Sequence, residues 1–337
     1  MKKLFLSLVA AMIATVSFAQ NTLVATLSHG ETVSMFYGTY ALRDAMNAAV
    51  SGDVINLSGG AFQAVNITKA VTMRGTGIDD AAPTYISGNF TINVPSDDAN
   101  RLSMEGIRCT GKIFMKGTFN SPYFVKSQFY SFEYDTNAAI KNAMFADCRI
   151  SDHYDLKGTS TLQFVNSYVN GFSNYDAANT QAAFINCVIQ PYSQGSFPSY
   201  IQNSQLLNCI IYQTHYSYNV SSWLPSSTIA TNCVSIGYNG LFSGQAANTG
   251  NKSVNYNEFG KVFKTFTGGY SEAQQFELSD EAKTNYLGID GTEVGMHGGV
   301  LPYNTTPSYP QITKMNVANK TTADGKLSVE IEVSAAE

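Results

Sequence analysis

Charged residues are scarce in this sequence of 337 residues, of which only 13% are Asp, Glu, Lys or Arg. The scarcity is greatest between Gly158 and Asn251, where there is no Lys or Arg and Asp176 is the only carboxylate in 94 residues. Acid–base catalysis, metal binding and the neutralisation of an acidic substrate all need charged groups. That stretch is therefore poorly equipped for any of them, and its single histidine, His215, is expected in a loop.

The sequence also lacks an apolar run long enough to span a membrane. Lys2 and Lys3 precede a short apolar stretch that ends near Val16 and is followed by small residues. This pattern predicts a secretory signal peptide over residues 1–19, so we expect an exported protein that is periplasmic, on the cell surface or extracellular. No Cys lies near the cleavage point, which argues against a lipid anchor there.

Basic residues are too few to attract a nucleic acid or an anionic membrane. Of the 20 Lys and Arg residues, 18 remain after the signal peptide is removed, against 25 acidic residues, which gives a net charge of about −7. A surface of that sign repels phosphate groups. The mature protein is therefore expected to bind neutral or cationic partners.

Disulfide bonds are not expected, although exported proteins often contain them. The number of Cys is five, which is odd, and Cys187, Cys209 and Cys233 occupy equal places in a repeat. Thiols stacked at about 4.8 Å, the spacing of neighbouring strands, lie in a line and do not converge on a metal ion. We expect reduced thiols that act as small apolar fillers, with a disulfide or a metal site as the alternative.

In place of charge, the sequence repeats a short phrase. "FINCVIQ", which begins at Phe184, has relatives in "FADCRIS", "FVNSYVN" and "LLNCIIY". The small residue at the centre of the phrase recurs at intervals of 19 to 24 residues, a period typical of a solenoid whose turns bury their apolar sides against one another. The equivalent positions are Ile107, Ser127, Cys148, Ser167, Cys187, Cys209 and Cys233.

An Asn or Asp precedes the small residue on five successive turns. Both residue types tolerate the left-handed backbone conformation, so they predict a sharp bend between two short strands. Phe184 and its equivalents should then point inward, and the small residue should fill the interior after the bend. We expect the five bend residues to stack in a ladder, which consists of Asp147, Asn166, Asn186, Asn208 and Asn232.

The repeat and the two segments around it resemble the right-handed parallel β-helix proteins of the pectin-lyase-like group. "ALRDAMNAAVSGDVINLSGG" is similar to the helical cap and first turns of that group, with the helix around Leu42 to Val50. "FELSDEAKTNYLGIDGTEVGMHGG" is similar to the closing segment of secreted bacterial members, without the usual Ser-Pro. The resemblance covers Thr39 to Gly299 and implies an all-β, single-stranded right-handed parallel β-helix. Because the group contains lyases, hydrolases, epimerases and adhesins, it implies no single activity.

The sequence therefore divides into a signal peptide over residues 1–19, a β-helix over 20–300, a Pro-containing linker over 301–310 and a C-terminal β extension over 311–337. In the extension, apolar residues alternate with polar ones after a turn at Asp324, which predicts a β-hairpin. A hairpin is too short to stand alone as a domain. It either packs on the end of the β-helix or offers its strands to a protein partner.

A Tyr-Asp phrase recurs three times, at intervals of 20 and 21 residues, and would place Asp135, Asp155 and Asp176 in a row. Two ionised carboxylates about 5 Å apart repel by about 1 kcal/mol in water, so such a row needs turn hydrogen bonds, a shared proton or a cation. We expect a structural role in the turns, with a weak Ca²⁺ site or a catalytic role as the alternatives. No other cofactor is expected.

Candidate catalytic residues gather around the phrase "SDHYDLKG". A lyase needs a base and a cation that neutralises the sugar carboxylate, and a hydrolase needs paired carboxylates. The residues of suitable type are Asp135, Asp155, His153 and Lys157. No motif ties them together, and a solvated loop with scattered charges is the alternative.

The uncharged stretch is rich in Tyr, Asn, Gln and Ser, which suit a neutral polysaccharide because rings cover the apolar faces of sugars while amides and hydroxyls bond their hydroxyl groups. Alternatively, the tyrosines pack between turns. The candidate ligand-binding residues are Tyr192, Tyr200, Tyr212, Tyr216, Tyr218 and Trp223. Two functions follow: an exported non-catalytic binding or structural module, or a polysaccharide lyase or glycoside hydrolase.

Overall fold

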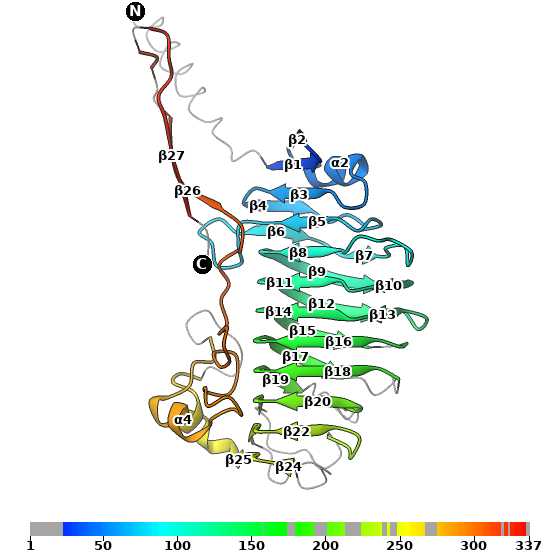
Figure 1. Ribbon diagram of the computed structural model, residues 1–337, viewed down its shortest axis with the longest axis vertical. Helices are drawn as coiled ribbons and strands as arrows, with labels where there is room; N and C mark the ends of the chain where they lie inside the picture. The colour runs from blue at the N-terminus through cyan, green and yellow to red at the C-terminus, as the bar shows by residue number, and fades with distance from the viewer. Residues whose placement is uncertain are drawn as a thin grey trace, which may run out of the picture.

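The stacked strands of the repeat build an elongated solenoid in which two long sheets run the length of the molecule (Figure 1). The computed structural model describes residues 23–156, 158–173, 179–191, 201–212, 224–237, 241–242, 248–266, 275–317, 320–322 and 324–334. The expected signal peptide lies outside these ranges. None of the helices within them has the length and apolar character needed to cross a membrane.

Each turn of the solenoid gives one strand to each of two sheets, and neighbouring turns pair in parallel. Sheet 1 consists, in spatial order, of β2 (Thr32–Tyr37), β1 (Val24–His29), β3 (Val54–Leu57), β5 (Thr72–Arg74), β8 (Ser103–Glu105), β11 (Tyr123–Val125), β14 (Ala143–Ala146), β16 (Thr161–Val165), β18 (Gln181–Ile185), β20 (Ser204–Leu207), β22 (Ile229–Thr231) and β24 (Asn248–Thr249). Sheet 2 consists of β4 (Gly60–Gln63), β6 (Thr84–Ser87), β7 (Phe90–Ile92), β9 (Ile107–Met115), β12 (Gln128–Tyr134), β15 (Arg149–Asp155), β17 (Tyr168–Ser173), β19 (Val188–Pro191), β21 (Ile210–Tyr212), β23 (Val234–Ile236) and β25 (Lys252–Val254). The predicted parallel β-solenoid is confirmed.

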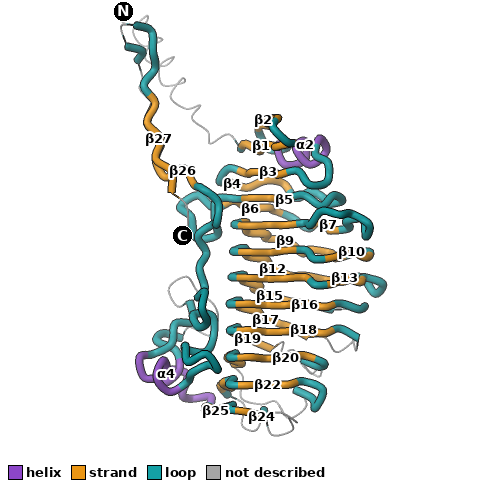
Figure 2. Tube along the Cα trace, in the orientation of Figure 1, coloured by secondary structure: helices purple, strands orange, loops and turns teal. Residues whose placement is uncertain are grey.

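Short elements complete the fold, and the helices lie near the two ends of the solenoid (Figure 2). The helices are α2 (Ala41–Ala48), the 3-10 helix η1 (Tyr256–Glu258), α3 (Phe259–Val262) and α4 (Asp280–Asn285). The remaining strands are the parallel pair β10 (Thr118–Asn120) and β13 (Ala139–Lys141), and the antiparallel pair β26 (Gln311–Val317) and β27 (Val329–Ser334).

The predicted helical cap is confirmed as α2, whose inward face includes the buried Leu42 and Met46. Directly after it, β3 forms the first strand of the parallel stack, paired with β5. The antiparallel hairpin β1–β2 ahead of the helix was not predicted. It extends sheet 1 by two strands and leaves Val33 exposed at the free edge.

The core is a column of stacked phenylalanines, one from each of four consecutive strands of sheet 1. Phe164 is fully buried, 4.9 Å from Phe145 and 4.9 Å from Phe184 between ring centroids, with interplanar angles of 14° and 6°. Phe124 continues the column with a stacked distance of 4.8 Å to Phe145. The inward orientation predicted for Phe184 and its equivalents is therefore correct.

The five ladder residues form the corner between sheets 1 and 2. Their φ angles lie between 45° and 55°, in the left-handed region that the sequence pattern predicted. Each backbone N–H donates to a carbonyl of the next turn, as from Asn166 to Ile185 (3.0 Å) and from Asn186 to Leu207 (2.9 Å). The residues therefore stack one above another at a single bend.

The small residue after each bend has a second function beside filling space. Ser167 Oγ donates to the carbonyl of Val165 at 2.7 Å, and Cys209 Sγ donates to the carbonyl of Leu207 at 3.3 Å. Ser and Cys both have a short side chain with a donor, so they can exchange at this position. All five cysteines are free and buried, and burial raises the pKa of the Cys109 and Cys148 thiols. The expectation of reduced fillers agrees with this arrangement.

Residues 287–309 form a strap that returns along the ladder corner toward the N-terminal end (Figure 1). Asn166 Nδ2 donates to the carbonyls of Met296 (2.7 Å) and Gly298 (2.8 Å). Gly299 has φ +86°, and a Cβ there would lie 2.2 Å from Asn186 Nδ2, so no other residue fits. The ladder residues thus have two roles: their backbone forms the bend, and their side-chain amides bind the strap. The sequence did not indicate the second role.

The predicted linker over 301–310 is the last part of this strap. Tyr303 is buried, and the backbone N–H of Ser308 donates to Glu105 at 2.6 Å. Beyond it, β26 and β27 form the predicted hairpin, which leaves the side of the solenoid (Figure 1). Ile331 and Val333 on β27 are 50% and 57% exposed, so the described part of the hairpin does not cover an end of the β-helix.

Replacing Asp147, the one acid in the ladder, by asparagine is expected to stabilise the fold above about pH 6 and to leave it unchanged below about pH 4. Burial raises the pKa of Asp147 from 3.8 to about 6, against the opposing effects of the Asn304 N–H and Lys126. The folded state therefore loses stability as the pH rises through that window, by about 1–2 kcal/mol for this half-buried group. Urea unfolding of both proteins from pH 4 to 8 measures the difference.

The matched control is the reverse substitution, Asn166→Asp. It removes the amide that donates to Met296 and Gly298 and places a carboxylate against their carbonyls, so a loss of about 2–3 kcal/mol is expected at pH 7. An Asp147→Asn variant with the same pH dependence as the wild type would show that Asp147 is not the titrating group.

Candidate binding groove

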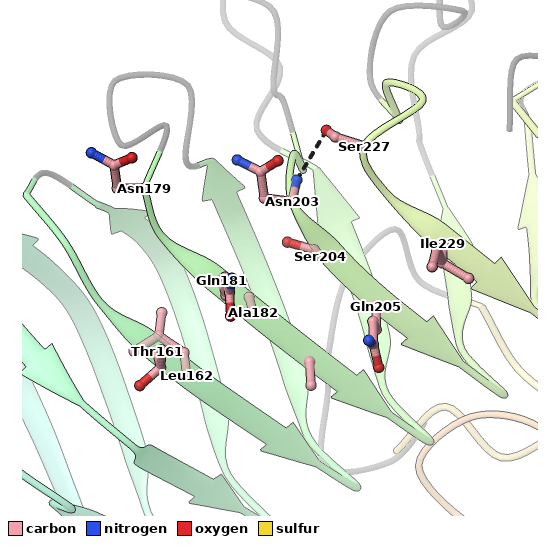
Figure 3. Close-up of a pocket in the computed structure, with 11 residues that line it drawn as sticks. Thr161, Leu162, Asn179, Gln181, Ala182, Asn203, Ser204, Gln205, Ser227 and Ile229 are labelled. Atoms are coloured by element: carbon pink, nitrogen blue, oxygen red, sulfur yellow. Dashed lines mark hydrogen bonds between the residues drawn. The ribbon is translucent and has the colours of Figure 1, made fainter. Parts of the chain in front are cut away.

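The outer face of sheet 1 carries a groove that follows the solenoid axis. Its C-terminal segment has a volume of about 580 Å³ and lies over β16, β18, β20 and β22 (Figure 3). A middle segment of about 380 Å³ shares Thr161, Leu162 and Ala183 with it. A third segment of about 360 Å³ shares Arg101 and Tyr123 with the middle one. The three segments therefore adjoin one another along the outer face of sheet 1.

One wall of the groove is a row of polar residues, each five positions before a corner residue. In the C-terminal segment the row consists of Thr161, Gln181, Asn203 and Ser227. Thr161 and Gln181 are partners in the parallel register, and the backbone N–H of Asn203 donates to Ser227 Oγ at 3.1 Å. Row members on adjacent turns are thus direct neighbours, one turn apart.

The floor of the groove alternates amide and apolar groups. Gln205 on β20 is exposed and lies in register between Ala183 on β18 and Ile229 on β22 (Figure 3). Ile229, on β22, is 43% exposed. Leu162 and Ala182 are buried beneath them.

This arrangement suits an extended polymer of hydroxyl groups. The turns repeat at about 4.8 Å, the spacing of parallel strands, so each turn offers a similar set of donors and acceptors to successive units of a chain. Amides and hydroxyls both donate and accept hydrogen bonds, as sugar hydroxyls do. None of the described residues that line the C-terminal segment carries a charge.

Of the aromatic residues predicted to bind ligand, only Tyr212 is described, and it is the last residue of β21. Tyr212 is fully buried and donates to Gln190 Oε1 at 2.7 Å. Its ring packs against Phe259, Phe263 and Phe276 of the segment that follows β25, so it is not available to a ligand. The others lie outside the described residues: Tyr192, Tyr200, Tyr216, Tyr218 and Trp223.

Asp135 and Asp155, two members of the predicted carboxylate row, are not opposite each other in the backbone register. In the register of β12 and β15, Asp155 is opposite Glu133 and Tyr154 is opposite Phe132, because a bulge after Phe129 adds a residue to β15. Asp135 is exposed in the following loop, where its backbone N–H donates to Met115 at 3.0 Å and its carbonyl accepts from Ala138 at 2.9 Å. Asp135 thus stabilises a turn. Asp176 and Lys157 lie outside the described residues.

The register places a different set of titratable groups on sheet 2. Lys112 Nζ forms an ion pair with Glu133 Oε1 at 2.5 Å, and His153 is opposite Ser131 on the neighbouring strand. The Glu133 hydrogen bond and charge raise the pKa of Lys112, which keeps this amine protonated and unsuited to act as a base. Within the described ranges, no three metal-ligating side chains gather at one place.

Sequence reasoning missed the groove because its residues lie on the outward face of strands identified by their inward residues. The signal is present nonetheless: the position five before each corner is polar on seven successive turns, when Gly106 and Lys126, which also have positive φ, are counted as the two corners before Asp147. These residues are Arg101, Ser121, Asn142, Thr161, Gln181, Asn203 and Ser227. The sequence was compared with protein-family models, with curated proteins and with solved structures, and none of the three comparisons found a match.

Proposed function

We propose that this protein is an exported, non-catalytic binding module that holds a neutral polysaccharide along the outer face of sheet 1. The observation that carries the proposal is the uncharged groove of about 580 Å³, lined by amides and hydroxyls from four successive turns. Export is inferred from the signal-peptide pattern of residues 1–19. The likeness to pectin-lyase-like proteins supports the solenoid scaffold and implies no chemistry of its own.

The distribution of charge separates binding from catalysis. Among the described residues that line the C-terminal and middle segments, Arg101 is the one charged residue, and none is a carboxylate. Hydrolysis needs two carboxylates across the scissile bond, and a lyase needs a base beside a neutralised acid. The ionisable pair of Lys112 and Glu133 lies instead on sheet 2. A ligand in the groove would therefore be bound and released unchanged.

Weak binding by each turn is consistent with this function. A hydrogen bond between an exposed amide and a sugar hydroxyl contributes about 1 kcal/mol, because it replaces bonds to water. Repetition along the solenoid, or several copies on one surface, raises the total strength without new kinds of contact. We therefore expect high affinity for a long polysaccharide and low affinity for a single sugar.

Affinity gels containing neutral plant, host or microbial polysaccharides test the proposal. The wild-type protein should be retarded, and the double variant Gln181→Ala, Gln205→Ala should bind at least about fivefold more weakly, since it loses one or two hydrogen bonds. Gln63→Ala is the matched control, because Gln63 is an exposed strand glutamine on sheet 2. Its retardation should equal that of the wild type.

Indifference to every neutral polysaccharide, or equal retardation of the groove variant and the wild type, would overturn the binding proposal. Retardation by pectate or alginate with release of unsaturated products would establish the lyase alternative. That result would direct attention to the loops near Asp135 and Asp155.

A further inference from the structure

The N-terminal segment of the groove differs from the rest because it is charged. Its lining includes Arg74, Arg101, Glu105, Thr72, Ser103 and Tyr123. Thr72, Ser103 and Tyr123 are partners in the parallel register of β5, β8 and β11, so their hydroxyl groups come from neighbouring positions of sheet 1. This segment therefore combines two guanidinium groups with three hydroxyl groups in about 360 Å³.

Neither guanidinium group is used by the fold as a hydrogen-bond donor. Among the described residues, Arg74 and Arg101 form no side-chain hydrogen bond and no ion pair, and Nε of Arg74 is buried without a partner. Each guanidinium instead lies over a ring, Arg74 at 5.2 Å from the centroid of Tyr309 and Arg101 at 4.7 Å from that of Tyr123. Stacking holds the planar groups in place and satisfies none of their N–H donors.

The one carboxylate in the segment is already engaged elsewhere. Glu105 Oε1 accepts from the backbone N–H of Ser308 at 2.6 Å and from Ser308 Oγ at 2.7 Å. No ion pair joins Glu105 to Arg74, although the two residues are opposite each other on β8 and β5. The strap thus removes the natural counterion of Arg74 and leaves an excess of positive charge in the segment.

We propose that this segment binds an oxyanion, the carboxylate or sulfate group of an acidic sugar in an otherwise neutral polysaccharide. Guanidinium groups bind such anions through paired hydrogen bonds, and the hydroxyl groups of Thr72 and Ser103 add neutral donors. Because Arg101 and Tyr123 also line the middle segment, a chain in the uncharged groove extends directly to this anion position. The identity of the polymer rests on the proposed function, whereas the anion position is tested separately.

The test uses the full chain and two small probes, sodium sulfate and sodium glucuronate, titrated at constant ionic strength. Calorimetry gives the affinity, and nitrogen-15 spectra of the arginine Nε–H groups locate the site. We expect at least one probe to bind, with roughly tenfold or greater weakening in Arg74→Gln and in Arg101→Gln. The probe that binds more tightly identifies the anion as carboxylate or sulfate.

Arg43→Gln is the matched control, because Arg43 also stacks on a tyrosine, Tyr40, at 4.1 Å but lies on α2 away from the groove. Its affinity should equal that of the wild type. Since Arg101 is exposed, Arg101→Gln remains decisive if Arg74→Gln does not fold. Absence of binding by both probes, or unchanged binding in Arg101→Gln, would overturn the inference. Loss of neutral-polysaccharide binding with retained anion binding would instead overturn only the proposed function.

Discussion

Replacing Phe164 by alanine should lower the free energy of unfolding by about 3–5 kcal/mol. The ring is fully buried, stacks on Phe145 and Phe184 at 4.9 Å each, and meets Phe172 edge-on at 5.9 Å. Its removal leaves a cavity between two turns that the strand hydrogen bonds hold at a fixed spacing, so the site collapses little. Denaturant unfolding followed by circular dichroism measures the loss.

Phe164→Leu is the matched control, because leucine already occupies the equivalent place on the turn of β20, where Leu206 is opposite Phe184. Leucine retains most of the buried volume, so a loss of about 1–1.5 kcal/mol is expected. In a solenoid the effect should spread mainly to adjacent turns, and hydrogen exchange should accelerate most in β14, β16 and β18. If the alanine and leucine variants unfolded at the same denaturant concentration, the column would not be a close-packed stack.

The repeat region was predictable because its determinants are local. The same three residue types recur in each phrase. An apolar residue such as Phe184 comes first, a residue with positive φ such as Asn186 follows, and a small hydrogen-bond donor such as Cys187 comes last. Each requirement is met within a few residues and then copied on the next turn. The turns stack because the phrase is repeated: neighbouring turns bury their equivalent apolar residues only when their strands pair in register.

The strap was not predictable in the same way, because its contacts join residues with no shared period. Asn166 and Met296 are 130 positions apart, and the sequence around Met296 shows neither alternation nor repeat.

The Tyr-Asp phrase failed for another reason. Its interval matches the average turn, but the bulge after Phe129 changes the register inside sheet 2, so Glu133 and not Asp135 is opposite Asp155.

The groove could not be recognised from its residue types alone. Titratable residues and exposed tyrosines were the natural candidates, yet Tyr212 is buried and the charged pair of sheet 2 is self-neutralised. Gln181 and Gln205 have no distinctive chemistry, and they become a candidate site only when their strands are stacked with the outward faces aligned. Similarly, the net negative charge of the chain says nothing about Arg74 and Arg101, because a local pocket depends on the few charges that line it.

Replacing Arg149 by methionine should cost about 3–5 kcal/mol and release the strap. Arg149 is 1% exposed and forms two parallel bonds to Asp79, at 3.0 and 2.5 Å, while its Nε donates to Tyr303 at 2.5 Å. The residue therefore joins sheet 2, the loop at Asp79 and the strap in one network. Methionine retains the apolar stem of the side chain but leaves Asp79 with the Thr305 hydroxyl at 2.8 Å and Arg108 at 3.6 Å. Denaturant unfolding gives the loss, and limited proteolysis in residues 299–309 reports the strap.

The acid side of the stability curve distinguishes the lost charge pair from lost packing. Burial alone would raise the pKa of Asp79, but the hydrogen bonds from Arg149 and Thr305 outweigh it and hold that pKa below 3.8. The pair therefore stabilises the fold above about pH 4, and this contribution disappears as the pH falls through the pKa of the folded state. The difference between wild type and Arg149→Met should shrink in acid, whereas a packing defect would persist. Arg43→Met is the control, because Arg43 forms an exposed pair with Asp44, and it should change the free energy of unfolding by less than about 0.5 kcal/mol. An equal loss in the Arg43 and Arg149 variants would contradict a stabilising role for the buried Arg149–Asp79 pair.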